Sequence, residues 1–422
     1  MLKRLKTDFV SSVLILISGT VFAQIIAYLL SPVITRLYSP EEMSYLSLFS
    51  RIITFLAVIA TARFELAFPL PKREEHAFSL FKVSLRITII TTLATAIFAL
   101  GLSFYPWQDA NIYFILALIP VGIFVLAFYN QGMNWAIRTK AFKSLSFSKV
   151  LSSSVNSLST VGFGLLSFGY KGLILGFIVG NLSSVFPFVK PFRKAQNKQK
   201  SFILKGRDFA IAKHYSEFPM INLPHVLIDL SKELFIAFYL IYTFEKDVLG
   251  LYDFSFRMLK LPISLIGISI SQVFFNKAAG MIQEGKSIFP LAKKTILTLL
   301  VLSVVPFGIL FYIGGDLFAF VFGEPWREAG EFSEIMSPWL MMNFLVSPVS
   351  QIPIILKKQR SFLFLSLFGT SLLIISLLIG EIFPSWNIGF KDTLKIVSVG
   401  QFIFLTYVVF WTVWLTKKYS ND

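Results

Sequence analysis

The sequence contains no cysteine and only three histidines among its 422 residues. Without thiols there is neither a disulfide framework nor a thiolate nucleophile, and so few imidazoles argue against a zinc or iron site. The phosphate-binding pattern GxxxxGK[ST] is also missing, which excludes ATP hydrolysis through a P-loop. We therefore expect no catalytic residues, no metal site and no cofactor.

Charge is scarce as well. Only 15% of the residues are charged and 55% are hydrophobic, whereas an ordinary globular domain is about 25% charged. Apolar runs close to the roughly 20 residues that a helix needs to cross a bilayer recur along the whole chain. The segments between these runs are too short for a hydrolase or glycosyltransferase domain. We therefore expect a transporter rather than an enzyme, and the short loops also disfavour a membrane glycan polymerase or ligase.

The apolar runs predict an all-α polytopic membrane protein with about 12 transmembrane helices. The predicted spans are 9–34, 44–68, 83–104, 111–130, 150–168, 172–189, 218–243, 248–275, 295–313, 336–356, 361–380 and 396–416.

The distribution of basic residues predicts the orientation of these spans. The N-terminal segment, alternate loops and the C-terminal tail hold 27 of the 39 lysine and arginine residues, whereas the opposite loops hold six. The positive-inside rule therefore places both termini in the cytoplasm. Most of the net charge of +16 then reflects topology, and we expect no nucleic-acid partner.

A long basic loop divides the chain into halves of six spans. We expect an N-terminal bundle over 1–195, a cytoplasmic linker over 196–215 and a C-terminal bundle over 216–422. The segment that ends at Arg51 resembles the one that ends at Arg257. Six spans return the chain to the side of the membrane where it started, so the two halves would have the same orientation in the membrane. Transporters commonly bind substrate between two halves related in this way.

Polar side chains form stripes within several predicted spans. In LYDFSFRMLKLPISLIGISI, the residues Asp253, Arg257 and Lys260 follow i, i+4 and i+7 and share one helical face. A charge at the bilayer centre costs at least about 2.5–3.5 kcal/mol, so these faces must meet protein or a hydrated cavity. The other residues that we assign to this cavity are Gln24, Arg51, Asp229, Lys232, Glu233 and Asn343.

Mutual neutralisation is the competing interpretation of these stripes. Asp253 can pair with Arg257 at i,i+4, and Asp229 with Lys232 at i,i+3. We nevertheless favour a functional role, because buried ion pairs contribute little stability. Arg63 and Glu65 lie near a predicted span end, where long side chains can snorkel to the membrane surface.

Four segments of the chain resemble the bacterial polysaccharide flippases. These are the O-antigen type (Wzx-like) exporters of the multidrug/oligosaccharidyl-lipid/polysaccharide superfamily. The segments are AQIIAYLLSPVITRLYSPEEMSYLSLFSRI, ATARFELAFPLP, NQGMNWAIRTKAFKSLSFSKV and GLYDFSFRMLKLPISLIGISISQVFFNKAAG.

The resemblance implies two six-helix bundles that form a V-shaped cavity in the bacterial inner membrane. It implies a flippase that carries undecaprenyl-diphosphate-linked oligosaccharide to the periplasmic leaflet, alongside other polysaccharide-assembly proteins. Arg51, Arg63, Glu65, Asp253 and Arg257 match the charged positions of its motifs. Transport is expected to be coupled to an H⁺ or Na⁺ gradient or to the membrane potential. A cation-coupled multidrug antiporter of the same superfamily is the main alternative.

Overall fold

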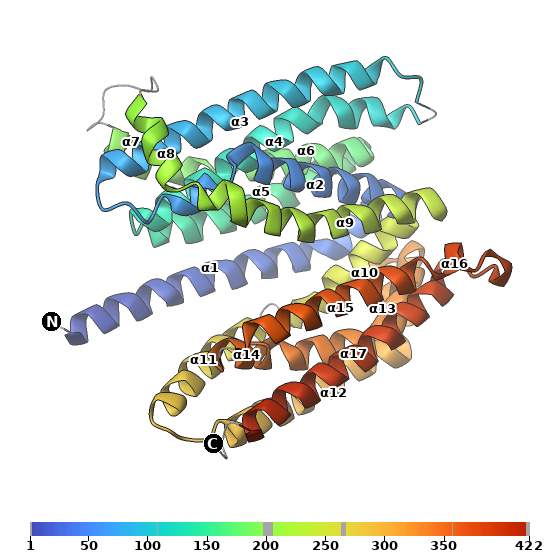
Figure 1. Ribbon diagram of the computed structural model, residues 1–422. Helices are drawn as coiled ribbons and strands as arrows, with labels where there is room; N and C mark the ends of the chain where they lie inside the picture. Colours follow the sequence, from blue (N-terminus) through green and yellow to red (C-terminus); the bar gives the residue numbers. More distant parts are fainter. Residues whose placement is uncertain (1, 108, 197–205, 263–266, 357, 419–422) are drawn as a thin grey trace. The chain divides into compact units, whose positions relative to one another are not determined.

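The computed structural model describes residues 2–107, 109–196, 206–262, 267–356 and 358–418, and the elements assigned there are all helical. Contacts divide the chain into two compact units, Met1–Leu249 and Gly250–Asp422. The helices of each unit lie in a bundle (Figure 1).

The first unit contains nine α-helices and two short segments of other helical types, all within the described residues. Helix α1 packs on α5, α5 on α6, and α2 on α3, α4, α6 and α9. The bounds are α1 Leu2–Leu37, α2 Pro40–Thr61, the 3-10 helix η1 Phe64–Ala67, α3 Glu74–Ser103, α4 Asn111–Arg138, α5 Phe142–Leu165, α6 Tyr170–Ser183, α7 Phe186–Gln196, α8 Gly206–His214, the π-helix η2 Phe218–Asn222 and α9 Leu223–Thr243.

The second unit is built around α13, which packs against α11, α12 and α17, while α15 packs on α17. Helix α10 begins two residues before the boundary between the units. The bounds are α10 Val248–Pro262, α11 Ile268–Gln283, α12 Phe289–Phe322, the 3-10 helix η4 Glu324–Trp326, α13 Arg327–Val349, α14 Ile352–Ile355, α15 Gln359–Leu377, α16 Ile379–Ile382, the 3-10 helix η5 Pro384–Trp386 and α17 Phe390–Lys418.

The prediction of a polytopic all-α membrane protein is confirmed. Nine helical segments in the described part of the chain are long and apolar enough to cross a membrane, and they coincide with nine of the predicted spans. The other three predicted spans, 150–168, 218–243 and 248–275, correspond to α5, to η2 with α9, and to α10 with α11. These helices are short or rich in polar residues. They include the two spans, α9 and α10, to which the sequence assigns most of the charged cavity residues.

Local chemistry explains where α2 begins and ends. The Ser39 hydroxyl accepts a hydrogen bond from the Glu42 amide, and the Glu42 carboxylate accepts one from the Ser39 amide, which forms a capping box. The helix ends at Thr61 because Ala62 and Arg63 both adopt left-handed backbone angles, with φ of 47° and 59°. The predicted span 44–68 was therefore wrong about its end, and Arg63 and Glu65 belong to the connection that follows α2.

The start of the seventh predicted span departs from an α-helix, as its prolines suggested. Residues Phe218–Asn222 form a π-helix. Pro219 is its second residue, and Pro224 is the second residue of α9, which follows directly. A proline cannot donate the backbone hydrogen bond of a regular helix, so the turn widens there. This places the Asn222 side chain within reach of Arg63, described below.

Candidate functional site

The first group of predicted site residues joins α2 to α9. The Arg51 guanidinium lies 3.4 Å from the Glu233 carboxylate and donates a second bond of 2.5 Å to the Glu233 carbonyl oxygen. Arg51 lies 11 residues into α2, roughly 17 Å along its axis. Its side chain is only 15% exposed, against 43% for Glu233. Arg51 is therefore held within the bundle by contacts that include the carboxylate and the carbonyl of Glu233.

Two further predicted residues lie on α9 near this pair. Lys232 is half-buried and Asp229 is exposed on the surface of the unit. Within the described part of the chain their charged groups do not form the ion pair expected from i,i+3 spacing. Mutual neutralisation therefore does not explain why this helix carries both charges.

Arg63 and Glu65 meet at the end of α2. Arg63 Nε donates to Asn222 Oδ1 at 2.9 Å, and Arg63 Nη1 lies 3.5 Å from Glu65 Oε1. Glu65 is 1% exposed, so the expectation that it snorkels to the surface was wrong. The left-handed Arg63 turns the chain sharply, and the carboxylate follows it into the core instead of outward. The contact ties η1 to the π-helix η2.

Gln24 lies on α1, where this helix contacts α5. Its Oε1 atom is buried and has no hydrogen-bond partner among the described residues. One helical turn away, Thr20 accepts a hydrogen bond of 2.9 Å from Lys149, and Ser153 donates to the Ala23 carbonyl at 2.6 Å. Lys149 is half-buried between α1 and α5. Sequence reasoning missed it, because it stands at the end of a basic segment assigned to a loop.

The charged stripe predicted in LYDFSFRMLKLPISLIGISI lies on α10 in the second unit and consists of Asp253, Arg257 and Lys260. Beside this stripe the helix is fixed in the core by Phe254, which packs on Phe318, Phe322 and Trp326. On the side opposite the stripe, the buried Ser255 donates a 2.5 Å bond to the Ala329 carbonyl. The stripe therefore has a defined direction, set by packing on its far side.

The two cations of this stripe rest on aromatic rings of their own helix. The Arg257 guanidinium carbon lies 5.3 Å from the centroid of Phe254, and Lys260 Nζ lies 4.2 Å from that of Phe256. Such contacts contribute about 0.5–1 kcal/mol at exposed sites. Both cationic residues are exposed on the surface of the unit, and Asp253 is half-buried. The rings hold the cations in place without covering them.

Asn343 lies half-buried on α13. It begins the uncharged polar stripe expected from the sequence, and Ser347 on the same helix accepts, through its carbonyl, a hydrogen bond from Ser271 on α11 at 3.5 Å. No group of three or more potential metal ligands occurs among the residues that the structure describes.

Near the opposite end of α2, three segments of the first unit meet at Asp109. Its carboxylate accepts hydrogen bonds from the Tyr45 hydroxyl at 2.6 Å, the Asn111 amide at 2.9 Å and Lys246 Nζ at 3.1 Å. Burial raises the pKa of Asp109, but these hydrogen bonds outweigh it and bring the pKa below its ordinary value. The hydrogen bond to Asp109 raises the pKa of Lys246. Both groups remain charged at neutral pH and join the α3–α4 and α9–α10 connections.

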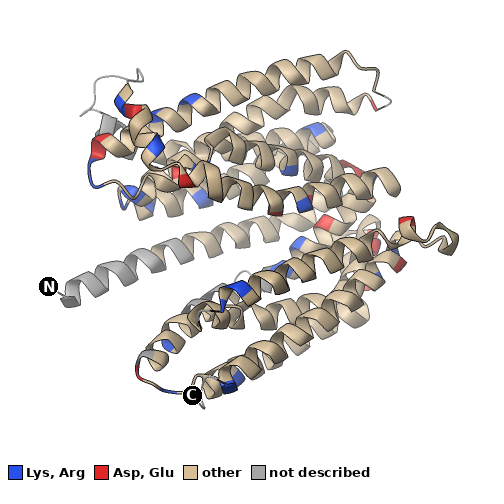
Figure 2. Cartoon of the chain, viewed as in Figure 1, with Lys and Arg blue, Asp and Glu red and all other residues tan. Residues whose placement is uncertain are grey.

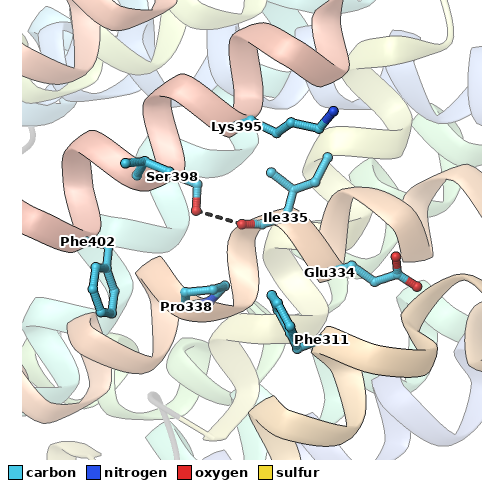
Figure 3. A pocket seen from close by; sticks show the side chains of 8 residues that line it. Phe311, Glu334, Ile335, Pro338, Lys395, Ser398 and Phe402 are labelled. Atoms are coloured by element: carbon cyan, nitrogen blue, oxygen red, sulfur yellow. Dashed lines mark hydrogen bonds between the residues drawn. The ribbon is translucent and has the colours of Figure 1, made fainter.

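A pocket of about 380 Å³ lies between α12, α13 and α17 of the second unit. Figure 3 shows Phe311, Pro338 and Phe402 on its walls, with Glu334 and Lys395 at its edge. Ser398 closes one side by donating a 2.6 Å bond to the Ile335 carbonyl. The walls are mostly apolar. None of the predicted site residues lines this pocket.

The predicted site residues thus form separate groups. Arg51 with Glu233, Arg63 with Glu65, and Gln24 belong to the first unit, whereas Asp253, Arg257, Lys260 and Asn343 belong to the second. The cavity shared by Arg51 and Arg257 remains a prediction.

Comparison with known families decides the assignment. The family model described as "Polysaccharide biosynthesis protein" matches residues 33–331. The chain belongs to this family. The match begins within α1 and extends into α13, so it covers most of the residues discussed above. A comparison with curated proteins gave no match.

Solved structures of this fold come from flippases and drug transporters. The lipid II flippase MurJ in an inward closed conformation matches with a TM-score of 0.69 and 14% identity, over 94% of this chain and 87% of that one. An inward-facing multidrug resistance MATE family transporter of the MOP superfamily gives the same TM-score and identity, over 94% and 95%. An outward-facing MATE transporter matches with a TM-score of 0.56 and 12% identity, over 97% and 96%. This polysaccharide biosynthesis family member therefore has the fold of the MOP transporters.

Proposed function

We propose that the protein is a flippase that moves undecaprenyl-diphosphate-linked oligosaccharide from the cytoplasmic to the periplasmic leaflet of the bacterial inner membrane. The membership of the polysaccharide biosynthesis family supports a glycan substrate, and the transporter fold supports movement rather than synthesis. The observation that carries the proposal is the cationic face of α10. There Arg257 and Lys260 are presented by a helix whose other face is locked into the core.

The chemistry of a diphosphate fits this arrangement. Such a group carries about two negative charges and needs cationic donors at depth, and the guanidinium fork matches phosphate oxygens. Arg51 and Arg257 would each supply one fork, with Lys232 and Lys260 as flexible point charges. Asp229, Glu233 and Asp253 would balance these cations when the site is empty, and Glu65 would balance Arg63.

Transport would follow alternating access. The cavity opens to the cytoplasm, the cations capture the diphosphate, the sugars occupy the hydrated interior, and the prenyl chain stays in the lipid. The two halves then rock about the bound substrate. An outward step moves negative charge toward the positive side of the membrane, which a potential of 100 mV favours by about 2.3 kcal/mol per charge. Coupling to this potential, or to an H⁺ or Na⁺ gradient, completes the proposal.

The test removes the two arginines separately. Loss of a hydrogen bond to a charged group costs about 1.5–3 kcal/mol, so Arg51→Ala and Arg257→Ala should each weaken substrate binding by about tenfold to hundredfold. Glycan export and precursor accumulation are measured in a strain without its own flippase, together with the amount of folded protein in the membrane. Arg→Lys variants should retain more export, because lysine keeps the charge but not the fork.

Two control variants separate binding from packing. Arg36→Ala removes an exposed arginine at the end of α1 and should leave export unchanged. Glu233→Ala removes the partner of Arg51 while keeping its guanidinium, so export should fall less than in Arg51→Ala. Wild-type export by both arginine variants would contradict the proposal. Drug efflux without glycan export would favour the antiporter that shares this fold.

A further inference from the structure

A basic pocket lies in the first unit, at the end of the bundle where α3 begins. Its volume is about 420 Å³. One wall is the connection from η1 to α3 with the first turn of α3, and the other is one face of α8. Figure 2 shows charged residues concentrated on α8 and the start of α3. The lining residues are Pro71, Lys72, Arg73, His76, Arg207, Ala210, Ile211, His214 and Tyr215.

The position of α8 against α3 is set by buried contacts. Lys82 Nζ lies 2.6 Å from one carboxylate oxygen of Asp208, and Ser79 donates a 2.5 Å bond to the other. Lys82 and Asp208 are 8% and 2% exposed. Ile211 and Ala212 join the aromatic cluster around Trp135. Because Asp208, Ile211 and Ala212 face the core, the lining residues of α8 are held in a fixed position.

The opposite wall is fixed by Arg138. Its Nη1 atom donates to the carbonyl oxygens of Phe68 and Pro71, at 2.8 Å each. The chain leading into Lys72 and Arg73 is thereby anchored to the end of α4. The pocket is therefore formed before any ligand arrives.

The lining carries three cations and two imidazoles, but no carboxylate. Two acidic residues lie beside it, Glu74 and Glu75 in the first turn of α3, and Glu75 pairs with Arg207 at 3.2 Å. Both members of that pair are more than half exposed, so the attraction is weak. Lys72 and Arg73 are exposed and form no ion pair within the described part of the chain. The pocket therefore keeps an excess of positive charge.

Exposed apolar side chains occur on both elements that form the pocket. Leu70, next to the lining residue Pro71, is 57% exposed, and Phe209, on the face of α8 that points away from the lining residues, is 56% exposed. A basic pocket beside exposed apolar side chains is typical of the surface where a membrane protein meets lipid headgroups. This arrangement favours a lipid over a soluble phosphate compound.

We propose that this pocket binds a phosphate group, supplied by the headgroup of an anionic phospholipid. Lys72, Arg73 and Arg207 would contact the phosphate oxygens, His76 and His214 would donate N–H groups to them, and Leu70 would lie against the acyl chains. The site would tie the connection before α3 and the helix α8 to one lipid. It does not depend on which substrate the protein carries.

The test titrates purified full-length protein with three phosphate ligands, phosphatidylglycerol, undecaprenyl diphosphate and inorganic diphosphate, and counts bound molecules by native mass spectrometry. The pocket variant combines Lys72→Gln with Arg73→Gln. The matched control combines Lys143→Gln with Lys213→Gln, which removes the same charge from exposed positions that do not line the pocket. We expect the pocket variant to bind phosphatidylglycerol at least about tenfold more weakly than the control.

The three ligands distinguish the sources of the phosphate. If the pocket variant loses affinity only for phosphatidylglycerol, the result supports an anionic phospholipid as the ligand. If it loses affinity only for one of the two diphosphates, that diphosphate is the ligand and the phospholipid assignment is overturned. Equal binding of all three ligands by the pocket variant and the control overturns the site itself. His214→Asn is a second variant from the other wall and should weaken the same ligand. Circular dichroism checks that every variant is folded.

Discussion

At the scale of single residues, the clearest structural feature is the ion pair between Lys82 and Asp208. Charges so thoroughly buried are costly unless they are paired and hydrogen-bonded, and here Ser79 supplies the additional bond. The sequence assigned Lys82 to a basic loop and Asp208 to the linker. Neither position indicates burial, because the partners are 126 residues apart.

Removing one member of this pair should destabilise the protein. Asp208→Asn leaves Lys82 buried without a full countercharge, which costs about 3–5 kcal/mol. The double variant Lys82→Met with Asp208→Leu replaces the pair by apolar side chains of similar size and should recover much of that stability. Thermal unfolding in detergent measures both effects. A single variant as stable as the wild type would show that the pair does not hold α8.

At the scale of helices, the backbones of α12 and α13 approach closely at Gly314 and Gly330. Gly330 allows this approach, because a Cβ added to it would lie 2.2 Å from the carbonyl oxygen of Gly314. The α-helical geometry of α12 breaks at Ile313, where φ is −134° and ψ is 23°. The Gly315 amide then donates to the Glu334 carboxylate at 2.8 Å. A side chain of α13 thus satisfies a backbone donor at the break in α12.

Substitution at this crossing should separate the two helices. Gly330→Ala forces a backbone contact that no rotamer change can relieve, and overpacking of this kind costs about 1–3 kcal/mol, occasionally more. Gly308→Ala is the matched control on α12, where an added Cβ meets no atom within 4 Å. The control should match or slightly exceed the wild type, since alanine favours a helix. Equal melting temperatures for the two variants would contradict the close crossing.

At the scale of the whole molecule, the contacts divide the chain at Leu249 and Gly250, whereas the sequence divides it at a linker over 196–215. Helix α8 lies within that linker and packs on α3, and α9 packs on α2. The linker and the seventh span are therefore joined to the first unit by side-chain contacts, including the Arg51–Glu233 pair. The two six-span halves remain the prediction for the repeat in the sequence.

The topology predicted by charge can be tested over the whole chain. A reporter active only in the cytoplasm should work when fused within 197–205 or after Lys418, because basic residues are concentrated there. It should fail when fused beside Lys171 or Pro384, which lie in connections poor in basic residues. A reversed pattern would show that the span count or the orientation is wrong.

Helical class and span positions were predictable because hydrophobic length is written directly in the sequence. The stripe of Asp253, Arg257 and Lys260 was predictable from helical spacing alone. The end of α2 was not, because no glycine marks the left-handed turn at Ala62 and Arg63. Lys149 was also missed, since its half-buried position depends on α1 packing against α5.

The sequence alone determined that this is a polytopic membrane protein and that its helices alternate with short connections. It also showed which helices carry arginine or lysine within their apolar spans. These properties follow from composition and periodicity, which act locally along the chain. The tertiary structure decided the partners: Glu233 for Arg51, Asn222 for Arg63 and Asp208 for Lys82. It also decided that a face of the linker helix α8 completes a basic pocket. Such pairings depend on how helices distant in sequence pack, and periodicity within one helix carries no information about its neighbours.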